Sequence, residues 1–362
     1  MWKSINVYYH KGDREQLIKT GILPSIHQLA ESGKIKRYYF IRHWLKGPHV
    51  GINLECLDEF VYEKDIKPVL YENIKDYLFK KPSEALEDNE MTATYEQLSR
   101  MELIKEDYLP LIPTNSILEV PYKKDSWLGE NGSKIISDYH SGTSYFVEKI
   151  LDQTEEELYP TLLGMMLGVI VCVKDIRRSY LSFRSHSEAM LHAYDKNNLI
   201  RTKFQKKYIL NQLLIKDLIA QVTEMEHSTE SNDEFLQEWT VYCKKFYTEL
   251  YKEVACGNVF PPKQDEVVLY FQEFGAPETW IVDEMSEFHQ MFYRKNDIDN
   301  LLNSDTFKSF RIILSLLYST FSNLGIKPIE RFYLCYLVAN GVEDFYGIDW
   351  KSLFEEERLN EI

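Results

Sequence analysis

The chain has 362 residues, of which 44% are hydrophobic, and this is enough for a substantial core. Its net charge of −15 argues against nucleic acid and anionic membranes as partners, because phosphate contacts need clustered Lys and Arg. The five cysteines include no CxxC pair, which predicts neither a disulfide framework nor a zinc site and favours the reducing cytoplasm. The longest apolar run, residues 162 to 173, is too short to span a bilayer.

The first eighty residues predict a βαββα unit. Residues 2 to 9 alternate as a strand, and Asp13 is expected to cap a helix that ends at Gly33. Residues 35 to 44 and 49 to 56 are rich in strand-forming side chains and flank a short turn, which predicts a hairpin. Residues 57 to 80 are amphipathic and predict a helix packed on an antiparallel or mixed sheet.

The rest of the chain is predicted to contain one more strand and many helices. Residues 81 to 90 are polar and acidic and are interpreted as a linker, and residues 117 to 122 as a short extended piece within a region of loops. Beyond residue 141 nearly every segment has helical spacing. The expected helices cover residues 143–151, 155–173, 182–194, 203–226, 233–254, 278–302, 306–324 and 328–345.

The sequence therefore predicts an α+β protein with an N-terminal βαββα sheet-containing part and a mostly helical C-terminal two thirds. We expect a single unit, 1–362, made of the βαββα part (1–80), a region of linker and loops (81–140) and the helical part (141–362). Phosphate loops, nucleophile elbows, zinc motifs and dinucleotide fingerprints are absent from the sequence. A catalyst of this kind would depend on positioning, hydrogen bonds and proton transfer, without metal or cofactor.

The first candidate cluster lies in the predicted hairpin. Arg42 and His43 on one arm, with His49 and Asn53 on the other, bring polar side chains close to one turn and are expected to bind substrate. The alternative is an exposed sheet edge with ordinary polar side chains.

The second cluster lies in the segment SFRSHSEAMLHAY. In a helix Arg184, Glu188 and His192 are spaced four residues apart and share a face, which is also the pattern of a helix-surface ion pair. The alternative is a functional one, in which His186 points inward from the helix start and donates to a substrate carbonyl. Arg184 and Glu188 are then candidate substrate-binding residues.

The third cluster lies near the C-terminus. Tyr333, Tyr336 and Asn340 fall on one helical stripe. Core tyrosines at this spacing are common. A phenol also remains protonated at neutral pH and can donate a hydrogen bond to a developing oxyanion without a metal.

Several segments resemble the elimination-domain family of lantibiotic dehydratases, whose stand-alone members occur in thiopeptide-type bacteriocin biosynthesis. Trp2, Leu23-Pro24 and YYFIRHWLKGPHVGINLE resemble the opening of that family. Further matches follow in the same order along the chain, so the resemblance covers nearly all of it. They are Glu119-Val120-Pro121-Tyr122, Ser144, Ser185-His186-Ser187-Glu188-Ala189 and Asn340.

The resemblance breaks at the residues that the family uses to eliminate glutamate. Where the family has Arg-x-Arg after the hairpin histidine, this chain has Gly51, Ile52 and Asn53. An expected arginine is also missing at residues 125 to 129, and Tyr336 and Leu337 stand where the family has its catalytic histidine segment. Without these residues both the carboxylate clamp and the proton carrier are lost, which argues against glutamate elimination.

The resemblance implies another reaction, that of the pyridine synthases of the same fold. These lyase or cyclase enzymes join two dehydroalanines by a formal aza-[4+2] cycloaddition, then expel water and the leader peptide. By this interpretation Tyr336 exchanges a proton with the tautomerising amide, and His186 or Ser185 orients it. Arg42, His43, His49, Asn53, Arg184, Glu188 and Asn340 are the expected substrate-binding residues.

Two alternatives remain open from the sequence: glutamate elimination from glutamylated Ser or Thr, which gives dehydroamino acids, and a non-catalytic scaffold that binds the precursor peptide at a sheet edge. In each case the expected partner is a precursor peptide of leader and core. Glutamylating and azole-forming enzymes are possible neighbours, whereas nucleic acid and membrane are not expected.

Overall fold

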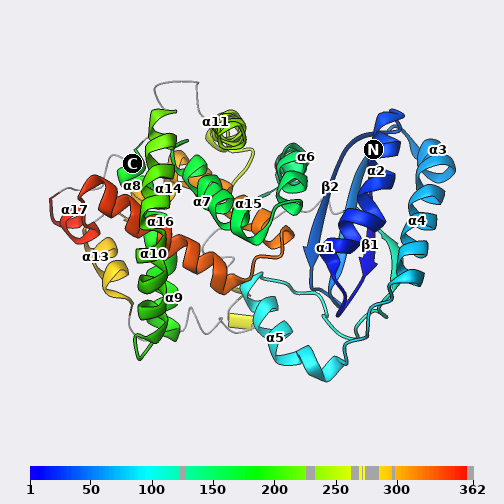
Figure 1. Ribbon diagram of the computed structural model, residues 1–362, viewed down its shortest axis with the longest axis horizontal. Coiled ribbons are helices and arrows are strands. Elements are labelled where there is room, and N and C mark those ends of the chain that lie inside the picture. Colours follow the sequence, from blue (N-terminus) through cyan, green and yellow to red (C-terminus); the bar gives the residue numbers. More distant parts are fainter. Residues whose placement is uncertain are drawn as a thin grey trace. The chain divides into compact units, whose positions relative to one another are not determined.

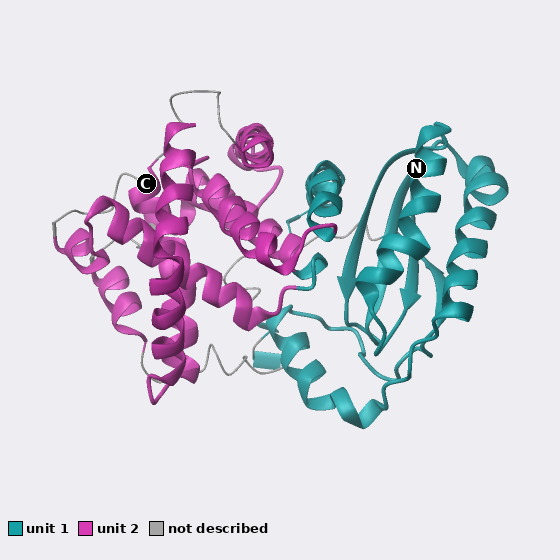
Figure 2. Ribbon diagram, viewed as in Figure 1, with its two compact units in different colours: residues 1–151, 262–277, 322–325 teal, residues 152–261, 278–321, 326–362 magenta. Residues whose placement is uncertain are grey.

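The computed structural model describes residues 1–122, 128–129, 131–173, 175–225, 233–261, 269–270, 272–273, 285–295 and 298–356. The chain forms two compact units (Figure 2). Unit 1 comprises residues 1–151, 262–277 and 322–325, and unit 2 comprises residues 152–261, 278–321 and 326–362. The expectation that residues 1–362 correspond to one elimination-domain-like unit stays a prediction.

Unit 1 begins with the predicted βαββα order, which the structure confirms (Figure 1). Asp13 caps the first helix by accepting hydrogen bonds from the backbone N–H groups of Glu15 and Gln16. Its elements are β1 (Trp2–Tyr8), α1 (Arg14–Gln16), the π-helix η1 (Leu17–Ile22), α2 (Leu23–Glu31), β2 (Ile35–His43), β3 (His49–Cys56), α3 (Glu59–Val61), the π-helix η2 (Tyr62–Ile66), α4 (Lys67–Lys80), α5 (Asp88–Met101), β4 (Ser116–Val120) and α6 (Gly132–Leu151).

The four strands form an antiparallel sheet in the order β2-β3-β1-β4. In the register Ile5 lies opposite Ile52, and Val7 lies opposite Val50. These side chains are fully buried on the face covered by α2, η1 and α4 (Figure 1). The other face is polar, and α6 covers its β2 side, where the ring of Tyr39 stacks on His140 at 5.4 Å. One sheet therefore has an apolar core face and a polar face.

The described residues between 81 and 140 form more helix than the sequence predicted. The interpretation of residues 81 to 90 as a linker is wrong at its end, because α5 begins at Asp88. Its start is stabilised by a capping box, in which Glu87 and Glu90 each accept a hydrogen bond from the other's backbone N–H. The helix α6 also begins at Gly132, ahead of the predicted residue 143.

Unit 2 is helical, as predicted. Its elements are α7 (Glu155–Ile170), α8 (Ile176–Ser179), α9 (Leu181–Tyr194), α10 (Leu199–Glu224), α11 (Glu234–Ala255), α13 (Glu287–Lys295), α14 (Ile298–Asn303), α15 (Asp305–Asn323, whose last two residues belong to unit 1), α16 (Pro328–Tyr346) and α17 (Trp350–Glu356). The sequence did not predict α17, and much of the helix expected over residues 278–302 lies outside the described residues. None of the described helices is long and apolar enough to cross a membrane.

The centre of unit 2 is the packing of α16 against α9 and α10 (Figure 1). Gly341 of α16 lets α10 approach closely, because a Cβ at this position would lie 2.3 Å from Cγ2 of Ile215. The α10 residues that face inward, such as Ile215 and Ile219, are fully buried. This contact sets the places of the polar side chains that α9 and α16 carry.

We expect Ile52→Ala to lower the free energy of unfolding of unit 1 by about 2–5 kcal/mol, because it leaves a cavity in the fully buried centre of the sheet. The matched control is Leu118→Ala in β4, whose side chain is 38% exposed and should cost less than about 1 kcal/mol. Urea denaturation followed by amide hydrogen exchange in β1 and β3 measures both. Equal effects of the two substitutions would contradict the assigned core face.

Candidate functional site

Arg42 of the hairpin has a guanidinium group with hydrogen-bond donors that are only partly used. Its backbone N–H donates to Oδ1 of Asn323, yet its buried Nε and Nη2 atoms have no hydrogen-bond acceptor among the described residues. Burial, together with the charge of Arg14, lowers the pKa of Arg42 to about 10, so the group remains charged at neutral pH. A buried cation without an acceptor is costly, which makes Arg42 a suitable binding group for a carbonyl or carboxylate.

The other predicted hairpin residues have partners in the hairpin turn or in β1. His49 is buried, and its Nδ1 lies 2.9 Å from the carbonyl oxygen of Gly47. Burial lowers the pKa of His49 to about 4, and the imidazole is therefore neutral. Nδ1 of His43 accepts from the backbone N–H of Leu45, while Oδ1 of Asn53 accepts from the hydroxyl of Ser4 at 2.9 Å. The rings of His43 and His49 lie 5.7 Å apart, so the hairpin brings these two together.

In unit 2 the structure brings the second and third predicted clusters together. Arg184 of α9 is buried and donates to both carboxylate oxygens of Glu343 on α16, at 3.1 and 2.6 Å. Glu188 lies 3.6 Å from Arg184 and accepts two hydrogen bonds from Arg201 of α10. The predicted helix-surface pair of Arg184 and Glu188 is thus part of a network of two cations and two carboxylates, in which only Arg201 is substantially exposed.

The two carboxylates of this network respond differently to burial. Burial raises the pKa of Glu343, and the hydrogen bonds and charge of Arg184 offset this only in part. Burial also acts to raise the pKa of Glu188, but the hydrogen bonds of Arg201 and the charges of Arg201 and Arg184 outweigh it and lower the pKa. Glu188 is therefore the firmly ionised member of the pair.

Tyr336 lies beside this network. Its side chain is only 4% exposed, its ring centroid is 6.0 Å from the Arg184 guanidinium carbon, and its hydroxyl donates to Oε1 of Gln205 at 2.6 Å. Burial raises the pKa of Tyr336, so the phenol stays protonated at neutral pH. Asn340, one turn later, donates to the backbone carbonyl of Tyr336, which is a contact within the helix.

Ser185 and His186 are adjacent on α9 and contact different partners. The hydroxyl of Ser185 lies 2.9 Å from Nε2 of His289 on α13, and Nδ1 of His289 lies 2.6 Å from the hydroxyl of Ser286. Nδ1 of His186 lies 2.6 Å from the hydroxyl of Tyr318 on α15. Ser185 is therefore paired with a histidine that could exchange its proton, in the manner of a hydroxyl and its general base.

Burial lowers the pKa of both histidines. The pKa of His186 falls to about 3, with the charge of Arg331 as the next cause. The pKa of His289 is also lowered by burial, although the carboxylate of Glu188 acts in the opposite direction. Both imidazoles are neutral at pH 7 and can accept a proton or a hydrogen bond.

Four residues of the unit 2 cluster were missed by the sequence analysis: Arg201, Gln205, His289 and Glu343. The only local signal among them is the spacing of Ser286 and His289, three residues apart at a helix start. The others come from α10 and α16 and meet α9 only through packing.

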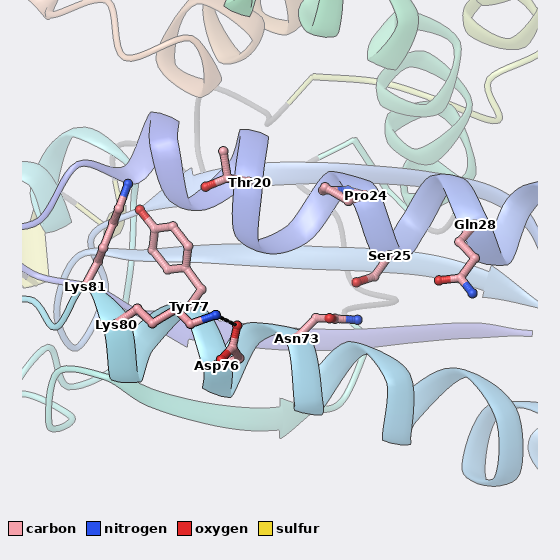
Figure 3. Close-up of a pocket in the computed structure, with 9 residues that line it drawn as sticks. All are labelled: Thr20, Pro24, Ser25, Gln28, Asn73, Asp76, Tyr77, Lys80 and Lys81. Carbon is pink, nitrogen blue, oxygen red and sulfur yellow. Dashed lines mark hydrogen bonds and ion pairs between the residues drawn. The ribbon is translucent and has the colours of Figure 1, made fainter.

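A separate groove of about 360 Å³ lies in unit 1 between α4 and the helical segment of η1 and α2 (Figure 3). Polar residues, including Thr20, Gln28 and Asn73, line it, and Lys80 is paired with Asp76 at 2.6 Å. The groove contains none of the predicted site residues.

Residues 2–342 match the family model described as lantibiotic biosynthesis dehydratase C-term, and the chain belongs to this family. The family resemblance found in the sequence is thereby confirmed. Comparison of the sequence with curated proteins finds no match. The segment 125–127, where an expected arginine is missing, lies outside the described residues.

Solved structures similar to this chain include a pyridine synthase, TbtD, from thiomuracin biosynthesis, with a TM-score of 0.71 and 19% identity over 96% of this chain and 99% of that one. TsrL has a TM-score of 0.68 and 15% identity, over 98% and 97% of the two chains. The tRNA-dependent lantibiotic dehydratase MibB from Microbispora sp. 107891 has a TM-score of 0.50 and 10% identity, and the match covers 96% of this chain but 28% of MibB. At these identities the likeness establishes the fold.

We expect His186→Gln to make the free energy of unfolding depend less on pH. The folded-state pKa of about 3 lies below the ordinary 6.5, so between these values the unfolded chain binds more protons and wild-type stability falls as the pH falls. The slope due to His186 reaches at most about 1.4 kcal/mol per pH unit, and glutamine removes it. Urea denaturation at several pH values between 7 and 4 measures the slope. The exposed His192→Gln is the control, and equal slopes for wild type and His186→Gln would contradict the assignment.

Proposed function

We propose that this protein is an enzyme that modifies a ribosomally synthesised bacteriocin precursor peptide. The proposed reaction is the thiopeptide-type aza-[4+2] cycloaddition of two dehydroalanines, which forms a pyridine macrocycle and releases the leader peptide. The enzyme would act in the cytoplasm as a lyase or cyclase without a cofactor. Azole-forming and glutamylating enzymes would prepare its substrate, because azoles and dehydroalanines must be present before the ring can close.

The observation that carries this proposal is the near-complete overlap with a pyridine synthase, over 96% of this chain and 99% of TbtD. The overlap with the dehydratase MibB covers only 28% of that larger chain. Family membership over residues 2–342 supports the same choice. The match along nearly the whole of a pyridine synthase supports cycloaddition over glutamate elimination as the proposed reaction.

The chemistry of the unit 2 cluster fits the proposed reaction. The cycloaddition needs an amide held as its iminol tautomer, so a proton must leave nitrogen while another reaches oxygen. Tyr336 provides a protonated phenol, and its hydroxyl is already directed to the amide oxygen of Gln205. A substrate amide oxygen that replaced Gln205 would receive the same hydrogen bond.

In this proposal Ser185 and His289 together accept the proton that leaves the substrate amide nitrogen. His289 is neutral and can take the proton of Ser185 as Ser185 takes one from the substrate amide nitrogen. Ser286 at the other ring nitrogen fixes the orientation of the imidazole. His186, which contacts Tyr318, then orients α9 and its neighbours and does not itself transfer a proton.

Arg42 is the proposed anchor for the peptide in unit 1. In the strand register it lies opposite Val50 on one face of the sheet, whereas His43 pairs with His49, and Asn53 with Tyr39, on the other face. The Nε and Nη2 atoms of Arg42 would donate to a backbone carbonyl or a carboxylate of the precursor. At Asn53 the family's arginine is absent, and the amide oxygen is already bonded to Ser4, so this position offers no cation to a glutamyl group.

The direct test is to mix the purified protein with a core peptide that carries azoles and dehydroalanines and is still attached to its leader. Mass spectrometry should detect the macrocycle and the freed leader peptide. If neither product forms while the peptide binds, the protein is a scaffold and the proposed cycloaddition is wrong.

We expect Tyr336→Phe to reduce the turnover number by about 10²–10⁴-fold with little change in peptide binding, because it removes one proton donor and keeps the buried ring. The matched control is Tyr333→Phe, one turn earlier on α16, where the buried ring packs against Phe204. Single-turnover kinetics and peptide affinity are measured for both variants. Unchanged turnover in Tyr336→Phe would exclude the proposed proton donor.

We expect Arg42→Gln to weaken peptide binding by about 10–100-fold, because a hydrogen bond from a charged donor contributes about 1.5–3 kcal/mol. The matched control is Arg37→Gln on the same strand, whose guanidinium is already paired with Glu55 and Asp138. Fluorescence anisotropy of a labelled precursor peptide gives both affinities. If the Arg37 substitution weakened binding more than the Arg42 substitution, Arg42 would not be the anchor of the peptide.

A non-catalytic, peptide-binding scaffold is the second candidate function. It is favoured by the burial of Tyr336 and by the partner its hydroxyl already has in Gln205, since a purely structural tyrosine has the same contacts. The turnover measurement described for Tyr336→Phe distinguishes the two functions.

A further inference from the structure

The outward face of α10 carries a stripe of exposed large apolar side chains. Ile209 is 59% exposed, and Leu210 and Leu213 are each 84% exposed. Leu214 completes the group at 36%. Scattered exposed leucines are ordinary, but four within two helical turns form a contiguous apolar surface of the kind that marks an interaction site.

This apolar stripe is separate from the core of unit 2. The opposite face of α10 is already packed, with Phe204, Tyr208, Ile215 and Ile219 buried. Close contact with α16 at Gly341 fixes which side of α10 faces inward. Leu210 and Leu213 therefore cannot turn into the same core without displacing residues that are buried there.

Charged residues on the same face are arranged with opposite signs at the two ends of the stripe. Lys203 and Lys206 precede the leucines, and Asp217 and Glu224 follow them, all four being exposed. Spacings of three, four and seven residues place them in line with Leu210 on one helical face. From the N-terminal to the C-terminal end of the helix, this face is therefore first basic, then apolar and then acidic.

Such a face is complementary to itself when two copies lie antiparallel. A two-fold axis midway between Leu210 and Leu213 also lies midway between Lys206 and Asp217, since each pair is centred on the same point of the helix. Leu210 of one copy then packs beside Leu213 of the other, and Lys206 meets Asp217 at both ends. A parallel pairing would place like charges together and is disfavoured.

We propose that this protein forms a two-fold symmetric homodimer in which α10 packs antiparallel against α10 of a second copy. The contact is isologous, as in most closed dimers. Because one helix of about 39 Å per subunit makes a small interface, the expected dissociation constant is on the order of micromolar. This inference does not depend on the proposed reaction.

The first test measures the mass of the full chain by sedimentation velocity at concentrations from about 1 to 200 µM, a range that brackets the expected constant. Wild type should change from monomer to dimer, and Leu210→Asp together with Leu213→Asp should remain monomeric. Phe79→Asp on α4, at an 87% exposed position, is the control and should dimerise like wild type. Circular dichroism checks that all variants fold. A wild type that stays monomeric throughout, or a dimer that persists in the double leucine variant, would overturn the proposal.

The second test reverses the charges that define the antiparallel register. Lys206→Glu alone and Asp217→Lys alone should each weaken dimerisation by about tenfold or more at low salt, because each places like charges opposite one another. The combined variant restores opposite charges and should dimerise nearly as well as wild type. A combined variant as weak as the single ones would exclude this register.

Discussion

The buried ion pair between Arg184 and Glu343 is the interaction on which the organisation of unit 2 depends. It joins α9 to α16 through two hydrogen bonds from one guanidinium. Removing Arg184 would leave the buried carboxylate of Glu343 without its cation, at a cost of about 3–5 kcal/mol, whereas Arg184 without Glu343 would still have Glu188 at 3.6 Å. Because Ser185 and Glu188 lie on the same helix as Arg184, this pair also sets their position relative to Tyr336. The pair thus fixes the position of α9 relative to α16, the two helices that carry these candidate catalytic groups.

Beside this charged network the protein keeps the candidate proton-transfer groups neutral. Burial lowers the pKa of His186 and His289 and raises that of Tyr336, and at neutral pH the cluster presents imidazoles and phenols without charge. The hairpin differs, since Arg42 remains a cation, and no described residue accepts a hydrogen bond from its Nε or Nη2 atom. Neutral groups suit proton exchange with an amide, whereas an incompletely satisfied cation suits binding. The two units therefore carry chemically different sets of side chains.

The helix α10 shows how one element can serve two surfaces. Its inner face supplies Arg201 and Gln205 to the cluster and packs closely on Gly341. Its outer face carries leucines that the core of unit 2 does not use. Helical periodicity separates these roles by placing them on opposite sides of the same backbone.

The sequence by itself determined the local structure. Strand alternation, helical spacing and the capping residue Asp13 are signals within a few residues, and they predicted the βαββα order, the hairpin and most helix bounds. Capping by Glu87 and Glu90 was local too, but their acidity suggested a loop and α5 was missed. The family resemblance came from sequence motifs and proved correct.

Only the tertiary structure decided the partners of the candidate site residues. Arg184 pairs with Glu343, which lies 159 residues away, and Ser185 contacts His289, 104 residues away. Helical spacing tells which side chains share a face, but it does not say which other helix packs on that face. That choice depends on long-range packing, such as the close approach of α10 at Gly341, and the same packing left Leu210 and Leu213 on the outside.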